Sequence, residues 1–311
     1  MRMRPGSSLA RRILLATLTL IAGGFWYLCL YEPRYGGSGA AGGRTLIFAH
    51  RGLGNYGPDN SLYAATQAYA DGFDGVDLDG QLTRDGKIVI FHDLSVDRLT
   101  GGAGRVSEHT LEELTKLDLA PRFKPGMTGA FVAPFEEFVE QSQGKGILMV
   151  ELKVPSASPT GIEQEAVRII RDHDARDRVF LSSFNPVVLT RLKEIDPGIR
   201  TVFIFMDTNW NAELLKEIKK GDLVDLPWFL RREFTRRAIR KFIRPDYLSV
   251  NHQVAESTID RLLAKGWPIF LWTPDRPDDI VRAVAKHPFG IISDEPYRAR
   301  ESAREAQRQA R

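Results

Sequence analysis

The sequence contains very little cysteine. Its 311 residues include a single one, Cys29, so a disulfide bond within the chain is impossible. A glycine-rich phosphate loop of the nucleotide-binding kind is also missing, so neither ATP nor GTP is indicated as a ligand. Net charge is small: removing the four arginines of residues 1–12 from the total of +3 leaves −1 for the remainder. The charge balance therefore gives no indication of a nucleic-acid partner, and nothing in the sequence implies a protein partner.

Long apolar runs are rare, with one exception near the N-terminus. Ile13 to Tyr31 form 19 residues without a charge, close to the roughly 20 that a membrane-spanning helix needs. The run predicts a single-pass transmembrane anchor, with a cleaved signal peptide ending near Ser38-Gly39-Ala40 as the alternative. The preceding arginines should stay cytoplasmic, which predicts a catalytic domain on the extracytoplasmic side, facing the periplasm of a bacterium.

The rest of the chain alternates short apolar runs with helical stretches. Strands are expected at 45–49, 75–82, 87–91, 147–152, 179–183, 200–205, 246–250, 269–273 and 289–293. Helices are expected at 61–71, 162–173, 186–195, 256–265 and 277–286. This pattern predicts a (β/α)₈ TIM barrel over residues 45–297. The ninth strand is explained by a short hairpin extension that turns at Asp85-Gly86. Residues 1–44 are then a basic stub, the anchor and a glycine-rich linker, and 298–311 a polar tail, either a solvated helix or disordered.

Acidic side chains gather at the predicted carboxyl ends of the strands, where barrels of this class carry their reactive groups. Asp77 and Asp79 are two residues apart on one strand, so both point to the same face. Two carboxylates on one face repel each other unless a cation or a proton lies between them. With Glu151 from another strand they form an all-oxygen set of metal ligands that suits Ca²⁺ or Mg²⁺. Asp93 and Asp294 also end strands and are interpreted as loop caps.

Two histidines also end apolar strands beside these acids. His50 and His92 can exchange protons near neutral pH, which predicts an acid/base pair. Arg51 and Lys153 place positive charge where a phosphate would lie. The combination of a hard metal ion, paired histidines and cations favours phosphoryl chemistry.

The order of these motifs resembles the glycerophosphodiester phosphodiesterases. The motifs are His50-Arg51-Gly52, Pro58-Asp59-Asn60-Ser61, Val76-Asp77-Leu78-Asp79, Thr83-Arg84-Asp85-Gly86-Lys87 and His92-Asp93, followed by Glu151-Leu152-Lys153, Ser183-Phe184, Trp272-Thr273 and Ser293-Asp294. The resemblance covers residues 45–297. It implies a (β/α)₈ barrel with a divalent metal that hydrolyses a glycerophosphodiester to an alcohol and glycerol 3-phosphate.

Carried over by position, the resemblance implies the same roles for the histidines, the cations and the three metal ligands. It adds Trp272, which would line the substrate groove. The chain departs from the family at Asp77 and Asp59, where glutamate is usual. The shorter arm of Asp77 would shift the metal or admit a water molecule.

The long connection after the strand at 200–205 suggests a lipid substrate. Residues 226–230 (LPWFL) precede 231–244 (RREFTRRAIRKFIR), a basic amphipathic helix with seven basic residues and one acid. Two interpretations stay open: a membrane-surface element, or a barrel helix with a solvated cationic face. Under the first, the chain would be a membrane-facing lysophospholipase D. A non-catalytic, anchored binding protein is a third possibility.

Overall fold

The computed structural model describes residues 6–32, 34–35, 44–154, 158–206 and 232–309. Eight parallel strands form a ring, because β1 pairs with both β2 and β10. The strands are β1 Leu46–His50, β2 Gly75–Leu82, β5 Ile147–Leu152, β6 Val179–Ser183, β7 Arg200–Phe205, β8 Tyr247–Asn251, β9 Ile269–Trp272 and β10 Gly290–Ser293. The closed ring confirms the predicted (β/α)₈ barrel.

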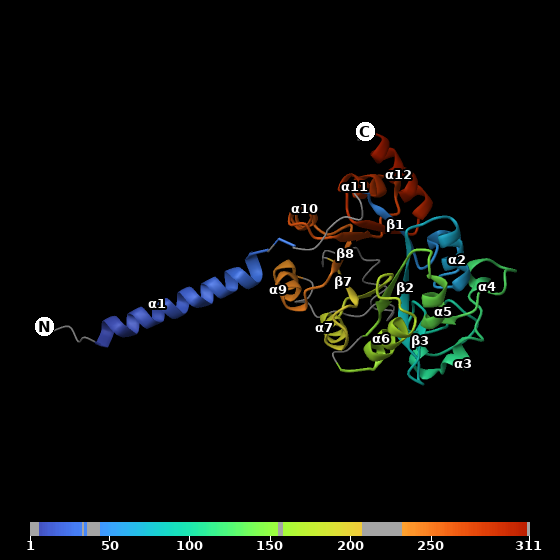
Figure 1. Cartoon of the computed structure of the whole chain (residues 1–311), viewed down its shortest axis with the longest axis horizontal. Coiled ribbons are helices and arrows are strands. Elements are labelled where there is room, and N and C mark those ends of the chain that lie inside the picture. The colour runs from blue at the N-terminus through green and yellow to red at the C-terminus, as the bar shows by residue number, and fades with distance from the viewer. Residues whose placement is uncertain (1–5, 33, 36–43, 155–157, 207–231, 310–311) are drawn as a thin grey trace.

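Helices surround the ring (Figure 1). They are α2 Leu62–Ala70, α6 Ile162–Asp172, α7 Pro186–Ile195, α9 Glu233–Ile243, α10 Glu256–Ala264, α11 Pro277–Ala285 and α12 Pro296–Gln309. All five predicted helices are among them. Ser61 caps α2 by accepting a hydrogen bond from the backbone amide of Ala64 at 3.1 Å. The expected polar tail continues α12 as a helix, and its Ala299 and Ala303 are buried.

The hairpin extension is also present. Strand β3, Ile88–Ile90, runs antiparallel to the end of β2, and Gly86 takes a left-handed conformation (φ +74°) in the turn between them. A further short strand, β4 Ala133–Pro134, pairs with β3. Between these strands lie α3 Leu111–Leu114 and α4 Ala120–Phe123, and α5 Phe135–Gln141 follows β4. The sequence pattern did not predict β4, α3, α4 or α5, since most span only two to four residues.

The barrel interior is built in layers by the two-residue alternation of its strands. An apolar layer fills the lower part and contains Leu46, Phe48, Met149, Phe180, Val202, Phe270 and Ile292. Moving two residues along β1, β2 and β5 from this level brings polar side chains into the same interior. Those side chains are His50, Asp77, Asp79 and Glu151. The apolar floor thus places the charged residues at the carboxyl ends of the strands.

The N-terminal helix α1, Gly6–Phe25, extends away from the barrel (Figure 1). No helix within the described ranges is long and apolar enough to cross a membrane, so the predicted transmembrane anchor is not supported. The apolar run does not form one uniform helix: α1 starts earlier, includes Arg11 and Arg12, and ends at Phe25. The run then continues as a π-helical turn, Trp26–Leu30, that packs on α9. The extracytoplasmic location was inferred from that anchor and stays a prediction.

Helix α9 does not present a solvated cationic face. Arg236 and Arg240 are 0% and 1% exposed, whereas Phe234 and Phe242 are 45% and 74% exposed. The residues do form a barrel helix, as the second interpretation expected, but its basic face is not solvated. Residues 226–231, which completed the predicted membrane-surface element, lie outside the described residues.

Candidate active site

The predicted site residues converge at the carboxyl end of the barrel. In the strand register, His50 lies opposite Asp77 between β1 and β2, and Asp79 lies opposite Glu151 between β2 and β5. Lys153 follows the last residue of β5. Because residues that share a register position in neighbouring parallel strands are adjacent, these groups form one continuous patch.

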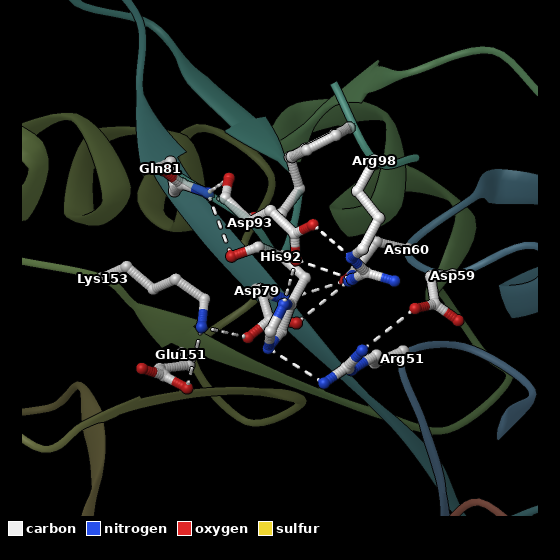
Figure 2. Close-up of polar contacts among 11 residues, drawn as sticks. Arg51, Asp59, Asn60, Asp79, Gln81, His92, Asp93, Arg98, Glu151 and Lys153 are labelled. Atoms are coloured by element: carbon white, nitrogen blue, oxygen red, sulfur yellow. Dashed lines mark hydrogen bonds and ion pairs between the residues drawn. The ribbon is translucent and has the colours of Figure 1, made fainter. Parts of the chain in front are cut away.

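Lys153 lies beside Asp79 and Glu151 and contacts both (Figure 2). Its buried Nζ is 3.0 Å from Asp79 Oδ1 and 3.6 Å from Glu151 Oε2. Burial alone would lower the pKa of Lys153, but Asp79 and Glu151 outweigh it and raise that pKa. Burial would likewise raise the pKa of Asp79, but Lys153 and the neighbouring cations lower it. Lys153 and Asp79 are therefore both charged at neutral pH.

Asn60 holds Asp79 from the opposite side. Its Nδ2 donates to Asp79 Oδ2 at 2.9 Å, and its Oδ1 accepts from the backbone amide of Asp79 at 2.9 Å. Asn60 has a left-handed backbone (φ +57°), a conformation that asparagine tolerates better than most residues. Ser61, the next residue, caps α2, whereas Asn60 orients a site carboxylate.

Asp77 is the least compensated acid of the patch. No hydrogen bond or ion pair joins its carboxylate to any other described residue. Burial, together with repulsion from Asp79 and Glu151, raises the pKa of Asp77 to about 7 against the attraction of His50. Burial likewise raises the pKa of Glu151. Within the described residues, no three His, Cys, Asp or Glu side chains form a group able to hold a metal ion. Lys153, lying between Asp79 and Glu151, separates the predicted ligands.

His50 is held by an aspartate from the last strand. Its Nδ1 is 2.8 Å from Asp294 Oδ1. Burial lowers the pKa of His50, but Asp294 outweighs burial and the pKa is raised to about 9. Gly54 allows Asp294 to approach: its φ is +58°, and a Cβ on it would lie 2.3 Å from the carbonyl oxygen of Asp294. His50 is therefore protonated at neutral pH.

His92 has the opposite state. Its Nδ1 is 2.7 Å from Asp93 Oδ1, and its Nε2 is 2.9 Å from a terminal nitrogen of Arg51 (Figure 2). A guanidinium can only donate hydrogen bonds, so Nε2 accepts and the ring proton is on Nδ1. Burial, reinforced by the charge of Lys153, lowers the pKa of His92 to about 4. His92 is therefore neutral and offers Nε2 as a proton acceptor.

Asp93, the carboxylate partner of His92, is held in place by Arg98 and Gln81. Arg98 donates to both oxygens of Asp93, at 2.6 and 2.7 Å. Gln81 Nε2 donates to the backbone carbonyls of Phe91 and Asp93, at 2.8 and 2.7 Å. The interpretation of Asp93 and Asp294 as loop caps is therefore wrong, because each accepts a hydrogen bond from a site histidine. Arg98 and Gln81 were missed because a loop residue and a mid-strand glutamine carry no local motif.

Three buried donors at this end of the barrel have no hydrogen-bond partner in the described part of the chain. They are Arg51 Nε, Ser182 Oγ and Trp272 Nε1. Arg51 also donates to Asp59 at 3.0 Å, so its guanidinium is fixed in place. Trp272 packs against an apolar group that we call the mouth cluster: Phe184, Ile204 and Met206. Donors that are buried without a partner favour an oxygen-rich ligand between them.

Comparison with known proteins identifies the family. The sequence pattern of the Glycerophosphoryl diester phosphodiesterase family matches residues 50–298. The chain is 31% identical over 254 residues to a glycerophosphodiester phosphodiesterase of Caldanaerobacter subterraneus, covering 81% of this chain and 95% of that protein. A putative glycerophosphodiester phosphodiesterase of Bacillus subtilis is 30% identical over 251 residues, covering 80% of this chain and 94% of its own length.

Solved structures agree on the fold. A putative glycerophosphoryl diester phosphodiesterase from Silicibacter pomeroyi superposes with a TM-score of 0.69 at 19% identity, covering 88% of this chain and 96% of its own. An Oleispira antarctica phosphodiesterase in complex with the product sn-glycerol-3-phosphate gives 0.67 at 21% identity, covering 83% and 96%. The resemblance in the sequence motifs is confirmed, and the chain belongs to the glycerophosphoryl diester phosphodiesterase family, whose members are phosphodiester hydrolases.

Proposed function

We propose that this protein hydrolyses glycerophosphodiesters to an alcohol and glycerol 3-phosphate, with His50 and His92 as the acid/base pair. The observation that carries the proposal is the pairing of each histidine with an aspartate of its own, in surroundings that raise the pKa of His50 and lower that of His92. Each Nδ1 is bound to its own aspartate, at 2.8 Å for His50 and 2.7 Å for His92. A site that must both accept and deliver a proton requires one ring of each kind.

His92 is proposed as the base. Its Nε2 is the acceptor atom of a neutral ring and is bonded to Arg51 in this structure; with Arg51 on the phosphate, it would take the proton of the attacking oxygen nucleophile. His50 is proposed as the acid, because its ring is charged and Asp294 holds the Nδ1 proton. Its Nε2 proton would pass to the oxygen of the leaving alcohol. Arg51, which contacts His92 in this structure, would bind the phosphate, and its unpartnered Nε is the donor available for a phosphate oxygen.

Lys153 is proposed as the second phosphate contact, and Trp272 as part of the groove that takes the organic group of the substrate. Both side chains come from the same end of the barrel as the histidines. Lys153 would contribute by its positive charge, since developing negative charge on a phosphoryl oxygen is stabilised by a nearby fixed cation.

The charge balance of the site supports a divalent cation. Three rim cations each have a carboxylate of their own: Arg51 pairs with Asp59, His50 with Asp294, and Arg98 with Asp93. That leaves Lys153 alone to neutralise Asp77, Asp79 and Glu151. When Asp77 and Glu151 are both ionised, two negative charges are uncompensated, which fits Ca²⁺ or Mg²⁺ in charge and in donor type. In the arrangement described, Lys153 lies between Asp79 and Glu151; we propose that the three carboxylates hold such an ion once Lys153 turns toward the phosphate, and the bound ion would act as a Lewis acid there.

Lysophospholipase D activity is the second candidate. It is favoured by the mouth cluster: Phe184, Ile204 and Met206 are only 7–8% exposed and place apolar side chains directly against Trp272. An apolar wall at this place suits a substrate with a hydrocarbon chain better than it suits a fully polar diester.

One assay set tests these proposals. The purified protein is given glycerophosphocholine or lysophosphatidylcholine, with and without a chelator, and the phosphorylated product is identified. Release of glycerol 3-phosphate supports the first proposal, and release of lysophosphatidic acid supports the second. His50→Ala should abolish turnover, whereas His173→Ala, a histidine paired with Glu136 away from the rim, should not. Turnover that survives His50→Ala refutes the mechanism. Turnover of neither substrate by the wild-type protein would favour the non-catalytic binding protein.

A further inference from the structure

The segment before the barrel is held against α9 by several contacts. Lys241 Nζ donates to the backbone carbonyls of Tyr27 and Leu28, and lies over the Tyr27 ring at 4.8 Å from its centroid. Arg237 donates to the carbonyl of Leu30. Basic side chains that bind carbonyl oxygens at the end of a helical segment satisfy acceptors that have no partner within it. The basic face of α9 therefore binds this chain's own N-terminal segment.

Glu32 is the main anchor of that contact. It is 3% exposed, and its Oε2 is 2.6 Å from Arg240 and 3.1 Å from Arg237. The same cluster contains Glu233, whose Oε1 is 2.8 Å from Arg240 and 2.7 Å from Arg261. Among the described residues, Glu32 thus supplies one of the two carboxylates that neutralise these buried arginines. Removing one partner from a buried ion pair is strongly destabilising, because it leaves a charge without compensation.

Beyond Glu32 the segment continues to the opposite end of the barrel. The Tyr35 hydroxyl donates to the backbone carbonyl of Asp246 at 2.8 Å. The backbone amide of Tyr35 donates to the backbone carbonyl of Lys265 at 2.7 Å. Its ring lies 4.9 Å from that of Trp267. The described residues between 26 and 35 therefore contact α9 and the loops before β8 and β9.

Helix α9 in turn contacts the end of β7 at the mouth of the barrel. Arg236 donates to the backbone carbonyl of Met206 at 2.5 Å, and its guanidinium lies 4.8 Å from the centroid of the Phe205 ring. Arg240, one helical turn later, lies 5.6 Å from the same ring. Met206 belongs to the mouth cluster beside Trp272. A continuous chain of contacts thus links Glu32 to the apolar wall of the candidate site.

We propose that residues 26–35 are a structural part of the catalytic domain, and that Glu32, through the arginines of α9, is a positioning residue for Met206 and the mouth cluster. The segment is thus more than a connection between α1 and the barrel. The effect on substrate, unlike the structural effect, rests on the proposed function.

The test compares Glu32→Gln with Glu112→Gln in the full chain by hydrogen exchange. Glu112 is a matched control, because it forms an ion pair with Lys116 on the surface. Exchange in α9 and at the end of β7 should become about tenfold faster or more in Glu32→Gln, while α6 stays unchanged. Unchanged exchange in α9 and β7, or equal changes in both variants, overturns the proposal.

A second variant covers the case in which Glu32→Gln unfolds the whole domain. Adding Arg240→Met removes the buried arginine that lost one of its two carboxylate partners, so the double variant should recover most of the folded protein. Failure of this rescue also overturns the proposal.

Kinetics test the link to the mouth. In Glu32→Gln, or in the double variant if only that folds, KM for glycerophosphocholine should rise several-fold while kcat stays within about twofold, because the cluster touches no reacting atom. A fall in kcat with KM unchanged contradicts this link. If the wild-type protein turns over no phosphodiester, the proposed function fails, while hydrogen exchange still decides the structural proposal.

Discussion

Replacing Asp93 with asparagine tests the proposed base most directly. Asp93 Oδ1 accepts the Nδ1 proton of His92, which leaves Nε2 as the acceptor, and Arg98 holds both carboxylate oxygens. Asparagine has nearly the same size but only one acceptor oxygen, and it carries no charge. If that oxygen stays with Arg98, the amide nitrogen faces His92 and favours the tautomer with its proton on Nε2. The base is then protonated at the wrong nitrogen.

The expected loss can be estimated from the role of the base. Wrong tautomers of a catalytic histidine and loss of general base catalysis reduce kcat by about 10²- to 10⁴-fold, or about 3–5 kcal/mol in the activation free energy. The free energy of unfolding should fall by less than the activation free energy rises. Asp93 has a lowered pKa because His92 and Arg98 outweigh its burial, so its ionised form stabilises the fold at neutral pH. Loss of charged hydrogen bonds there should cost about 1.5–3 kcal/mol of unfolding free energy.

Steady-state kinetics and chemical denaturation of the same samples separate the two effects. Asp172→Asn is the control, since Asp172 is half exposed and pairs with Arg168 on the surface. The prediction is a large fall in kcat for Asp93→Asn at a substrate concentration well above KM, with the protein still folded. A kcat within twofold of wild type, or a loss no larger than that of Asp172→Asn, would refute the role assigned to Asp93 and to its histidine.

Three further predictions concern the same site. The pH profile of kcat/KM should be bell-shaped: activity rises with pH through about 4 as His92 loses its proton, and falls through about 9 as His50 loses its own; a profile with no high-pH limb would exclude His50 as the acid. Chelation should abolish turnover reversibly, and Asp77→Asn should weaken restoration by Ca²⁺ or Mg²⁺, as measured by titration of activity. Gly54→Ala should destabilise the fold by about 1–3 kcal/mol in denaturant unfolding, because its φ is +58° and the new Cβ would meet Asp294.

The barrel could be predicted from the sequence because its signals are local. Each strand of the ring is a short apolar run, and each observed strand begins and ends within about a residue of the expected range. The elements between β3 and β5 could not be predicted in the same way. Strand β4 has two residues and α3 has four, which is too short for a periodic pattern to be recognised.

The prediction was right for the site residues whose orientation is set by the two-residue period of a strand. His50, Asp77, Asp79 and Glu151 come together because each faces the barrel interior at the same end of its strand. The supporting residues could not be predicted, because their contacts form only when distant loops meet the rim. Asn60 and Arg98 are examples, since neither belongs to a strand.

Helix α9 shows the limit of helical periodicity. Its basic and apolar positions recur with the helical period, but periodicity does not say what covers each face. The partner that covers Arg240 is Glu32, which precedes it by 208 residues. Buried arginines therefore looked like a solvated or membrane-facing surface until their partners were placed.

Binding of a divalent ion should release a proton from Asp77. The other rim carboxylates form ion pairs with cations, whereas the Asp77 carboxylate forms none among the described residues, and its pKa is raised to about 7. A divalent ion binds the ionised carboxylate, so it must displace the proton that Asp77 partly carries at neutral pH. Affinity for Ca²⁺ or Mg²⁺ should therefore weaken as the pH falls below about 7, by up to about tenfold per pH unit for one proton released. Calorimetry in buffers with different ionisation enthalpies measures that proton directly. Binding without proton release at pH 6 would show that the metal does not use Asp77.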